Sequence, residues 1–361
     1  MPREGARYGR FLRFLGQGGW VLFLGLILGV VAAAVSVVPT LRHSGMSTGD
    51  GVHPETYGFT LAPALVPVSR IVGGGMPKDG LHALSAPGVW TRAQVDSAAR
   101  ERRSRYLVPS DRVVGVEIDG VARAYPLRVL VWHEVANDTV AGRPIVVTYN
   151  PLCDSAAVFD RKIGGETLTF GVSGLLYNSN LLMYDVRPHT RQESLWSQLL
   201  MRAVAGPAVG GGSSLRPLAC TVVTWRAWCS AHPETGVVAP DPRLSSRYQQ
   251  DPYANYFGSD LLRFPVSPLP PVGSLARKTP LVVIDRNGEF FAYSWPALAR
   301  RAGERGRWET QLGGQTIRFI IGDHPPTVTV QALTGPQPVA IYASYFAWYA
   351  MHPHDTTWVL E

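Results

Sequence analysis

The chain has 361 residues and a formal net charge of +7, and only 17% of its residues are charged. Much of the excess comes from four arginines near the N-terminus, and the other arginines form no basic stripe interleaved with aromatic residues, so we expect no nucleic-acid partner. The 37 glycines and 29 prolines favour many turns over long helices. The composition therefore predicts a mainly β or α+β fold, and the length allows two or three domains.

An apolar segment near the N-terminus predicts a membrane anchor. Residues 18–38 form an uncharged run of the length that a helix needs to cross a bilayer, and residues 1–17 before it form a basic tail. The positive-inside rule places that tail in the cytoplasm and the rest of the chain outside the plasma (inner) membrane, as a single-pass protein. A cleaved signal peptide is the alternative, because Ala32–Ser36 offers small residues to a peptidase. Residues 39–69 show no periodicity and predict a tether.

Two β-rich modules are expected beyond the tether. The first, 70–238, contains short β-type runs separated by turn residues, namely Val113–Ile118, Val121–Tyr125, Ile145–Tyr149, Ala156–Asp160, Thr167–Val172 and Leu181–Tyr184. A proline-crowded stretch, 239–280, predicts a linker that packs across the surface. The second module, 281–361, is much shorter and is expected to lack some of the strands of the first.

An internal duplication relates the two modules. Three pairs of motifs recur in the same order: Ile118-Asp119-Gly120 with Ala124-Tyr125 returns as Ile284-Asp285, Gly288 and Ala292-Tyr293; Ala141–Val147 returns as Gly313–Phe319; and Trp225–Trp228 with His232-Pro233 returns as Tyr345–Trp348 with His352-Pro353. The first two pairs are typical of β-hairpins and tight turns. The third is typical of a short helix that a proline terminates. We therefore expect two related antiparallel modules, each closed by a short helix, behind the membrane helix.

Five kinds of motif stand out along the chain: Ile71–Leu81, Gly115–Arg161, Phe170–Ser179, Ser194–Gln198 and the two helices that end in His-Pro. In this order they resemble a prokaryotic family known as domain of unknown function 3179. The resemblance runs from Ile71 to about Trp358. It implies a mostly extracytoplasmic protein, often anchored by a helix or a lipid, and it brings no established reaction. Where the family commonly has a cysteine before Pro151-Leu152, this chain has Asn150, so the Cys-x-x-Cys arrangement is lost.

Cys153 is the candidate reactive thiol. A nearby base can activate a cysteine as a nucleophile or as a ligand of a soft or borderline metal ion, and His133 is the natural candidate for that base or second ligand. Cys153 can equally be a small buried hydrophobic residue and His133 a hydrogen-bonded core residue. A dithiol redox centre is disfavoured because Asn150 replaces the second thiol.

A binding module is the hypothesis that we favour over a thiol- or metal-dependent enzyme. The two modules are expected to form a cleft for a small ligand or an envelope partner protein. The residues assigned to this cleft are aromatic or polar: Trp132, Tyr149, Asn150, Asp154, Tyr177, Asn178 and Trp196. Tyr177 and Asn178 can equally be turn or edge-strand residues.

Overall fold

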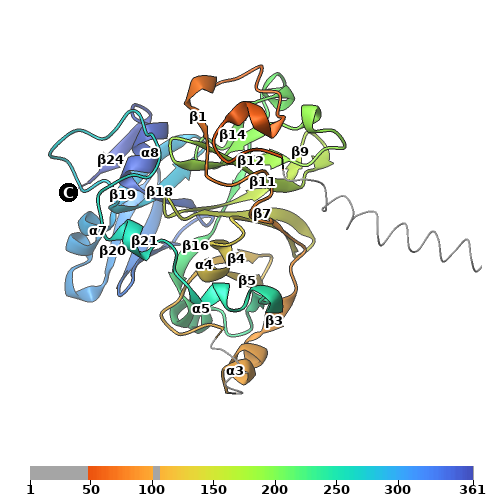
Figure 1. The fold of residues 1–361 in the computed structure, drawn as a ribbon. Helices are drawn as coiled ribbons and strands as arrows, with labels where there is room; N and C mark the ends of the chain where they lie inside the picture. The colour runs from red at the N-terminus through yellow and green to blue at the C-terminus, as the bar shows by residue number, and fades with distance from the viewer. Residues whose placement is uncertain (1–47, 101–105, 361) are drawn as a thin grey trace, which may run out of the picture. The chain divides into compact units, whose positions relative to one another are not determined.

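The computed structural model describes residues 48–100 and 106–360. This part of the chain is mainly β, with three large sheets and a two-stranded ribbon (Figure 1). The expected basic tail 1–17 and membrane segment 18–38 lie outside it. Within the described residues, no helix is both long enough and apolar enough to span a bilayer.

The central sheet has nine strands. Its order is β2 (Leu84–Ser85), β6 (Val135–Val140), β7 (Arg143–Asn150), β8 (Ser155–Asp160), β23 (Val339–Ser344), β18 (Pro280–Arg286), β19 (Glu289–Ser294) and β24 (Thr356–Val359), and β15 (Pro217–Leu218) also pairs with β8. Both of its faces are buried, which β7 illustrates. Ile145 and Val147 belong to one hydrophobic core and Val146 to another, as expected from the alternation of side chains along a strand.

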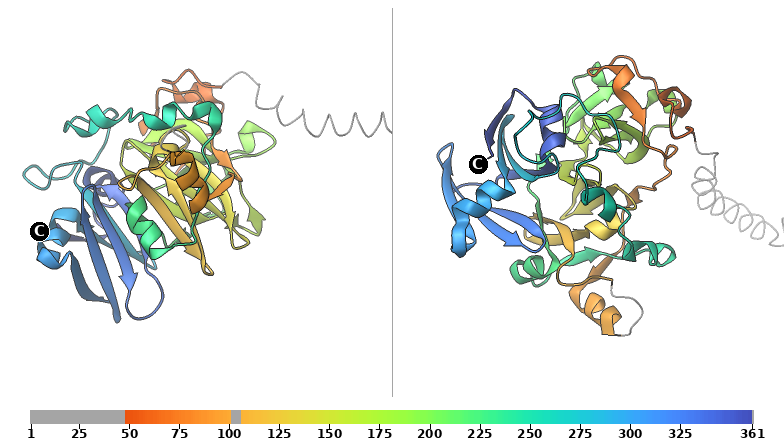
Figure 2. Two further views of the ribbon diagram at one scale, coloured as in Figure 1. Left: turned by 90° about the horizontal axis from the view of Figure 1, so that it is seen from below. Right: turned by 60° about the vertical axis from the view of Figure 1, so that its left-hand side comes forward.

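Two further sheets supply these cores. An eight-stranded sheet has the order β20 (Arg307–Leu312), β21 (Gln315–Asp323), β22 (Pro326–Ala332), β16 (Thr221–Thr224), β4 (Arg112–Ile118), β5 (Val121–Pro126), β17 (Gly236–Val238) and β3 (Val89–Thr91). A five-stranded sheet has the order β1 (Ile71–Gly73), β11 (Phe170–Tyr177), β12 (Asn180–Asp185), β13 (Leu195–Ser197) and β14 (Arg202–Ala205). The ribbon consists of β9 (Lys162–Ile163) and β10 (Glu166–Thr167). The views agree that β7 lies between the β11–β12 sheet and the β4–β5 sheet (Figures 1 and 2).

The described helices are short. They are α3 (Arg92–Arg100), α4 (Leu127–Leu130), α5 (Trp225–Ala231), α6 (Ala254–Phe257), α7 (Trp295–Ala302) and α8 (Tyr345–Met351). α5 and α8 follow β16 and β23 directly, and each is followed by His-Pro, where proline cannot continue a helix. α8 is buried in the core that the central and five-stranded sheets share, through Phe346, Ala347 and Trp348.

The internal duplication is visible in the order of elements. The series β4, β5, α4, β6, β7, β8 and then β16, α5, β17 has its counterpart in β18, β19, α7, β20, β21, β22 and then β23, α8, β24. Even the parallel pairing recurs, since β17 lies parallel to β5 and β24 lies parallel to β19. The elements β9–β15, Lys162–Leu218, have no counterpart in the second half; we call them the insertion.

The turns refine the alignment of the two halves. Asp119 and Gly120 have φ of 48° and 78°, and Asn287 and Gly288 have φ of 56° and 90°. Each pair is therefore a two-residue hairpin turn in the left-handed region, where Asn, Asp and Gly are favoured. The counterpart of Asp119 is thus Asn287, and the match of Asp119 with Asp285 was wrong by two residues.

The expected modules 70–238 and 281–361 are not separate domains. β8 of the first half pairs with β23 of the second through Ala156 and Tyr342, and β16 pairs with β22 through Val222 and Val328. Each repeat thus contributes three strands to the sheet that carries the other repeat's hairpin and helix (Figure 2). The described residues form one compact unit in consequence.

The expected tether is also corrected for its described part. Within residues 48–69, Tyr57 is fully buried and its hydroxyl donates to the Met76 carbonyl at 2.6 Å. The Leu65 amide donates to the Val204 carbonyl at 2.9 Å. Because this stretch has buried side chains of its own, it packs on the sheets instead of spanning a gap. Residues 39–47 lie outside the described part.

The proline-crowded stretch 239–280 crosses the surface as a series of short turns and helices. Tyr248 and Tyr256 anchor it, since both are buried. The Tyr256 hydroxyl donates to the Leu152 carbonyl at 3.0 Å, so the stretch covers the turn between β7 and β8 that contains Cys153.

Candidate functional site

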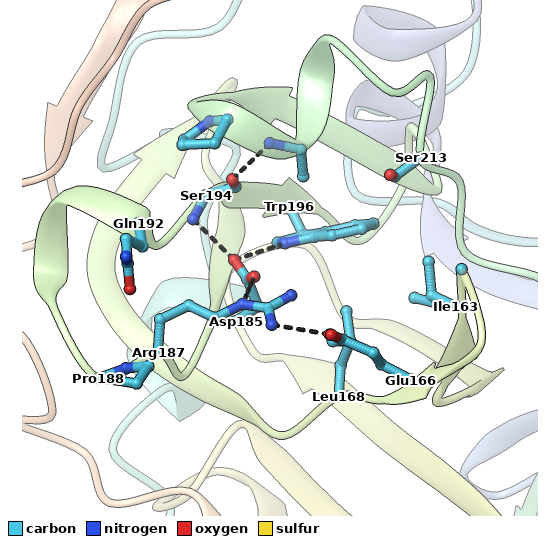
Figure 3. A pocket seen from close by; sticks show the side chains of 13 residues that line it. Ile163, Glu166, Leu168, Asp185, Arg187, Pro188, Gln192, Ser194, Trp196 and Ser213 are labelled. Carbon is cyan, nitrogen blue, oxygen red and sulfur yellow. Dashed lines mark hydrogen bonds and ion pairs between the residues drawn. The ribbon is translucent and has the colours of Figure 1, made fainter.

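Trp196 lies at a pocket formed by the insertion. The pocket has a volume of about 450 Å³, within the range that small-molecule sites usually have. β12 and β13 pair through Met183 and Trp196, and this pairing brings Trp196 next to the end of β12. The pocket, which we call the Trp196 pocket, is lined by Ile163, Gly164, Glu166, Leu168, Asp185, Arg187, Pro188, Gln192, Ser194, Trp196, Pro207, Ala208 and Ser213 (Figure 3).

A buried carboxylate organises this pocket. Asp185, the last residue of β12, is 1% exposed. It accepts hydrogen bonds from the Ser194 amide at 2.7 Å, from the Trp196 indole at 3.1 Å and from Nε of Arg187 at 2.6 Å. Such charge-assisted bonds are stronger than neutral ones, so they fix the tryptophan and the guanidinium relative to each other (Figure 3).

Arg187 is the cation of the pocket. Its Nη1 donates to Glu166 at 2.8 Å, and hydrogen bonds to Glu166 and Asp185 hold the pKa of the guanidinium above its usual value. No residue of the described part accepts a hydrogen bond from Nη2. The Glu166 side chain is 64% exposed, whereas that of Asp185 is 2% exposed, so one partner is fixed and the other is free to move.

Tyr149 and Asp154 lie elsewhere, between the two repeats. The Tyr149 hydroxyl donates to Asp154 at 2.8 Å, and Arg112 binds the same carboxylate through two bonds of 2.8 Å. Burial alone raises the pKa of Asp154, but Arg112 and Tyr149 outweigh it and lower that pKa below its usual value. The adjoining space has only about 30 Å³, roughly the volume of one water molecule in the liquid, so this ion pair leaves room for a water molecule but not for a larger ligand.

Tyr177 and Asn178 form a cleft neither with Trp196 nor with Tyr149. Asn178 lies in the turn between β11 and β12, where its Oδ1 accepts from Arg70 at 2.7 Å and from the Ser267 amide at 3.1 Å. The Arg70 guanidinium lies 5.4 Å from the centre of the Tyr177 ring. These contacts attach the proline-crowded stretch to the five-stranded sheet.

The structure does not join Cys153 to His133. Cys153 is fully buried, its Sγ donates to the Ser179 carbonyl at 3.3 Å, and burial raises its pKa well above the usual value. His133 has other partners at both ring nitrogens: the His82 carbonyl at 2.6 Å and the Tyr248 hydroxyl at 2.8 Å. Burial lowers the pKa of His133 and favours the neutral ring. Asn150 belongs to the Cys153 turn, because its Oδ1 accepts from the Cys153 amide at 3.0 Å.

Trp132 and the expected metal ligands are the remaining parts of the predicted site. Trp132 lies beside His133, with the Arg247 guanidinium 5.6 Å from the centre of its ring. Within the described residues, no three His, Cys, Asp or Glu side chains are placed so that they could share a metal ion. Cys153 and His133 have separate partners and are not part of any such group.

The family of the chain is established by comparison. A family model described as Protein of unknown function (DUF3179) matches residues 78–342. The chain belongs to this family. The match includes all residues that line the Trp196 pocket. No curated protein and no solved structure matches the chain, and the DUF3179 description specifies neither a reaction nor a ligand.

The sequence analysis missed the charged residues of the Trp196 pocket. Asp185 and Arg187 directly follow the apolar run Leu181–Tyr184, and charges at the end of a buried strand are a signal that was available. Glu134 was also missed. It follows Trp132 and His133, is 8% exposed and has a positive φ of 53°, and burial raises its pKa to about 8.

Proposed function

We propose that this DUF3179 protein is a membrane-anchored, extracytoplasmic binding module that takes a small anionic ligand in the Trp196 pocket. The supporting observation is the position of Arg187, which a buried carboxylate orients while its Nη2 donors face no protein acceptor in the described part. Arginine is suited to carboxylate and phosphate groups, because its planar fork makes two parallel hydrogen bonds.

The exposed carboxylate of Glu166 suggests how a ligand enters. Glu166 satisfies Nη1 of Arg187 from a side chain that is 64% exposed. A ligand carboxylate or phosphate can replace it at little cost, since an exposed ion pair contributes only about 0–1 kcal/mol. Trp196, Leu168 and Ile163 then provide apolar contacts for the rest of the ligand.

The thiol or metal enzyme centred on Cys153 and His133 receives less support. A thiolate is the reactive form of cysteine, and burial disfavours it here. His133 accepts from or donates to other groups at both nitrogens, so a base for Cys153 is not in place. A binding function requires neither group.

The ligand proposal is tested by calorimetry on the purified full-length chain, in detergent where its N-terminal segment requires it. The probes are succinate, citrate and inorganic phosphate, with neutral succinamide as the uncharged comparison. We expect at least one anion to bind, Arg187→Gln to weaken it at least tenfold, and Glu166→Gln to strengthen it by freeing Arg187. Arg191→Gln is the matched control, because Arg191 is exposed and does not line the pocket. Equal affinity in Arg187→Gln and in Arg191→Gln contradicts the proposal.

The location is tested separately. Alkaline phosphatase, which is active only outside the cytoplasm because it needs disulfides, is fused after Glu361 in a bacterial host. We expect activity with the intact N-terminal segment and none when residues 1–38 are deleted. The two results are independent, so a cytoplasmic C-terminus would contradict the extracytoplasmic location and leave the pocket proposal untouched.

A further inference from the structure

A second pocket lies at the end of α5, where the two repeats meet. It has a volume of about 510 Å³. β4, β16 and α5 of the first repeat form one side, and β22 of the second repeat forms the other. This pocket, which we call the His232 pocket, is lined by Gly115, Glu117, Ala219, Cys220, Thr221, Val223, Ala227, Trp228, Ala231, His232, Thr329, Val330, Gln331 and Gln337.

One wall of the His232 pocket is rigid. The Trp228 ring packs directly on Gly115, where a Cβ would lie 2.2 Å from ring atom Cζ3. The indole donates to Oγ1 of Thr235 at 2.8 Å, and the His232 ring lies on it with centroids 3.9 Å apart. Trp228 is thus packed on both faces and is 3% exposed, so the His232 ring, whose side chain is 22% exposed, is the more accessible of the two rings.

The charges of this pocket are the reverse of those in the Trp196 pocket. None of the residues that line it, all of which the structure describes, is Lys or Arg. Glu117 lies on its wall with a side chain that is 51% exposed, and its Oε2 is 3.4 Å from Nδ1 of His232. A neutral His232 that keeps its proton on Nδ1, facing Glu117, has an acceptor lone pair on Nε2. Within the described residues, Nε2 has no hydrogen-bond partner.

We propose that the His232 pocket binds a small organic cation, a primary ammonium with an apolar body. The carboxylate of Glu117 neutralises the ammonium group, and Nε2 of His232 and the Thr221 and Thr329 hydroxyls accept its hydrogen bonds. The apolar body lies against Val330 and the exposed methyl groups of Ala227 and Ala231 on α5. This site is distinct from the Trp196 pocket and does not depend on the function proposed for it.

The test measures binding of 2-phenylethylammonium by saturation-transfer NMR to the full-length chain. The charge-reversed comparison is 3-phenylpropionate, which has a similar size and apolar body. We expect the ammonium to bind and the carboxylate not to compete with it. Glu117→Gln should weaken ammonium binding at least tenfold, and Ala227→Phe should abolish it by filling the pocket. Glu234→Gln is the matched control, because it removes the same charge from an exposed position outside the pocket.

Three outcomes overturn the proposal. They are no detectable binding of the ammonium, equal binding of the ammonium and the carboxylate, and equal effects of Glu117→Gln and Glu234→Gln. Arg187→Gln separates the two pockets, because it should leave ammonium binding unchanged. Circular dichroism of each variant establishes that it is folded before its binding is compared.

Discussion

The ends of helices α5 and α8 are two copies of one arrangement in different surroundings. At each end a histidine ring packs against a tryptophan ring. The ring centroids are 3.9 Å apart for Trp228 and His232 and 4.3 Å apart for Trp348 and His352. Each indole donates to a threonine hydroxyl, at 2.8 Å to Thr235 and at 3.0 Å to Thr356. The local sequence therefore produces the same local geometry twice.

The two ends differ in what covers them. Nε2 of His352 faces the Leu199 carbonyl at 2.9 Å, and Leu199 belongs to the insertion. The His352 side chain is 7% exposed, whereas that of His232 is 22% exposed and lines a pocket. The same motif is thus part of the core where the insertion packs on it, and it lines a pocket where the described residues leave it uncovered.

The largest losses in the free energy of unfolding are expected when the two tryptophans are replaced. Trp348 is fully buried and meets the edge of Phe290 at 5.1 Å, so Trp348→Ala should lower the free energy of unfolding by about 3–5 kcal/mol. Trp228 is 3% exposed and borders the His232 pocket, so water can occupy part of the space that Trp228→Ala leaves, and the loss should lie at the lower end of that range, about 3 kcal/mol. Urea unfolding followed by circular dichroism measures both. Equal losses would mean that the two helix ends are equally buried in solution.

Replacing the two histidines should also change the free energy of unfolding by different amounts. His352→Ala leaves the Leu199 carbonyl without its partner in the core and removes the 3.0 Å contact with Asp355, so a loss of about 2–3 kcal/mol is expected. His232→Ala removes a partly exposed side chain and should cost less than about 1 kcal/mol. The same unfolding measurement applies. A larger loss for His232→Ala would assign it a structural role and weaken the case for the His232 pocket.

The sequence predicted much of what is local in this fold. The hairpin at Asp119-Gly120 and the Trp-His helix ends were found because short-range turn and helix signals determine them. The exchange of strands between repeats was not found. Ala156 pairs with Tyr342, 186 positions further along, and an apolar alternation shows that a strand has buried faces without showing which strand lies beside it.

The candidate site shows the same limit. Trp196 was assigned to a ligand site and lines a pocket, but Tyr149 and Tyr177 were grouped with it and lie in other clusters. Residues were grouped by type and proximity in sequence, whereas the pocket is created by the pairing of β12 with β13 and by the ribbon that carries Glu166. Cys153 was singled out for its chemistry, but it is buried in the core that the central and five-stranded sheets share, where its Sγ donates to the Ser179 carbonyl 26 positions further along.

The alkylation rates of two cysteines, Cys229 on α5 and Cys153 beside α8, compare the two helix ends. Cys229 lies on α5 and is buried with 6% exposure, and this burial raises its pKa to about 11. Cys153 lies on the covered side, where its carbonyl accepts from the Ser344 amide just before α8, and it is fully buried. Under native conditions at pH 9, iodoacetamide should label Cys229 at least tenfold faster than Cys153. The labelling rate of Cys229 should rise about tenfold per pH unit up to pH 11, because the thiolate is the reactive form.

Peptide mapping by mass spectrometry assigns the labelled cysteine, and labelling in urea gives the unprotected rate for each. Rapid labelling of Cys153 near neutral pH would contradict its burial. It would also restore the thiol enzyme as the better hypothesis, since only an accessible and activated thiolate reacts at that pH.

The smallest effect concerns the residues that begin the two helices. Oγ1 of Thr224 accepts from the Ala227 amide at 3.2 Å and caps α5, so Thr224→Ala should lower the free energy of unfolding by about 1 kcal/mol. Ser344 occupies the same position before α8 but does not cap it, and its buried Oγ has no hydrogen-bond partner in the described part. Ser344→Ala should therefore be neutral or slightly stabilising, because it removes a hydroxyl that is buried without a partner. Thr224→Ala should thus lower the free energy of unfolding, whereas Ser344→Ala should leave it unchanged or raise it slightly. The two substitutions occupy equivalent positions, so such a difference would come from the surroundings of the two helix ends and not from helix propensity.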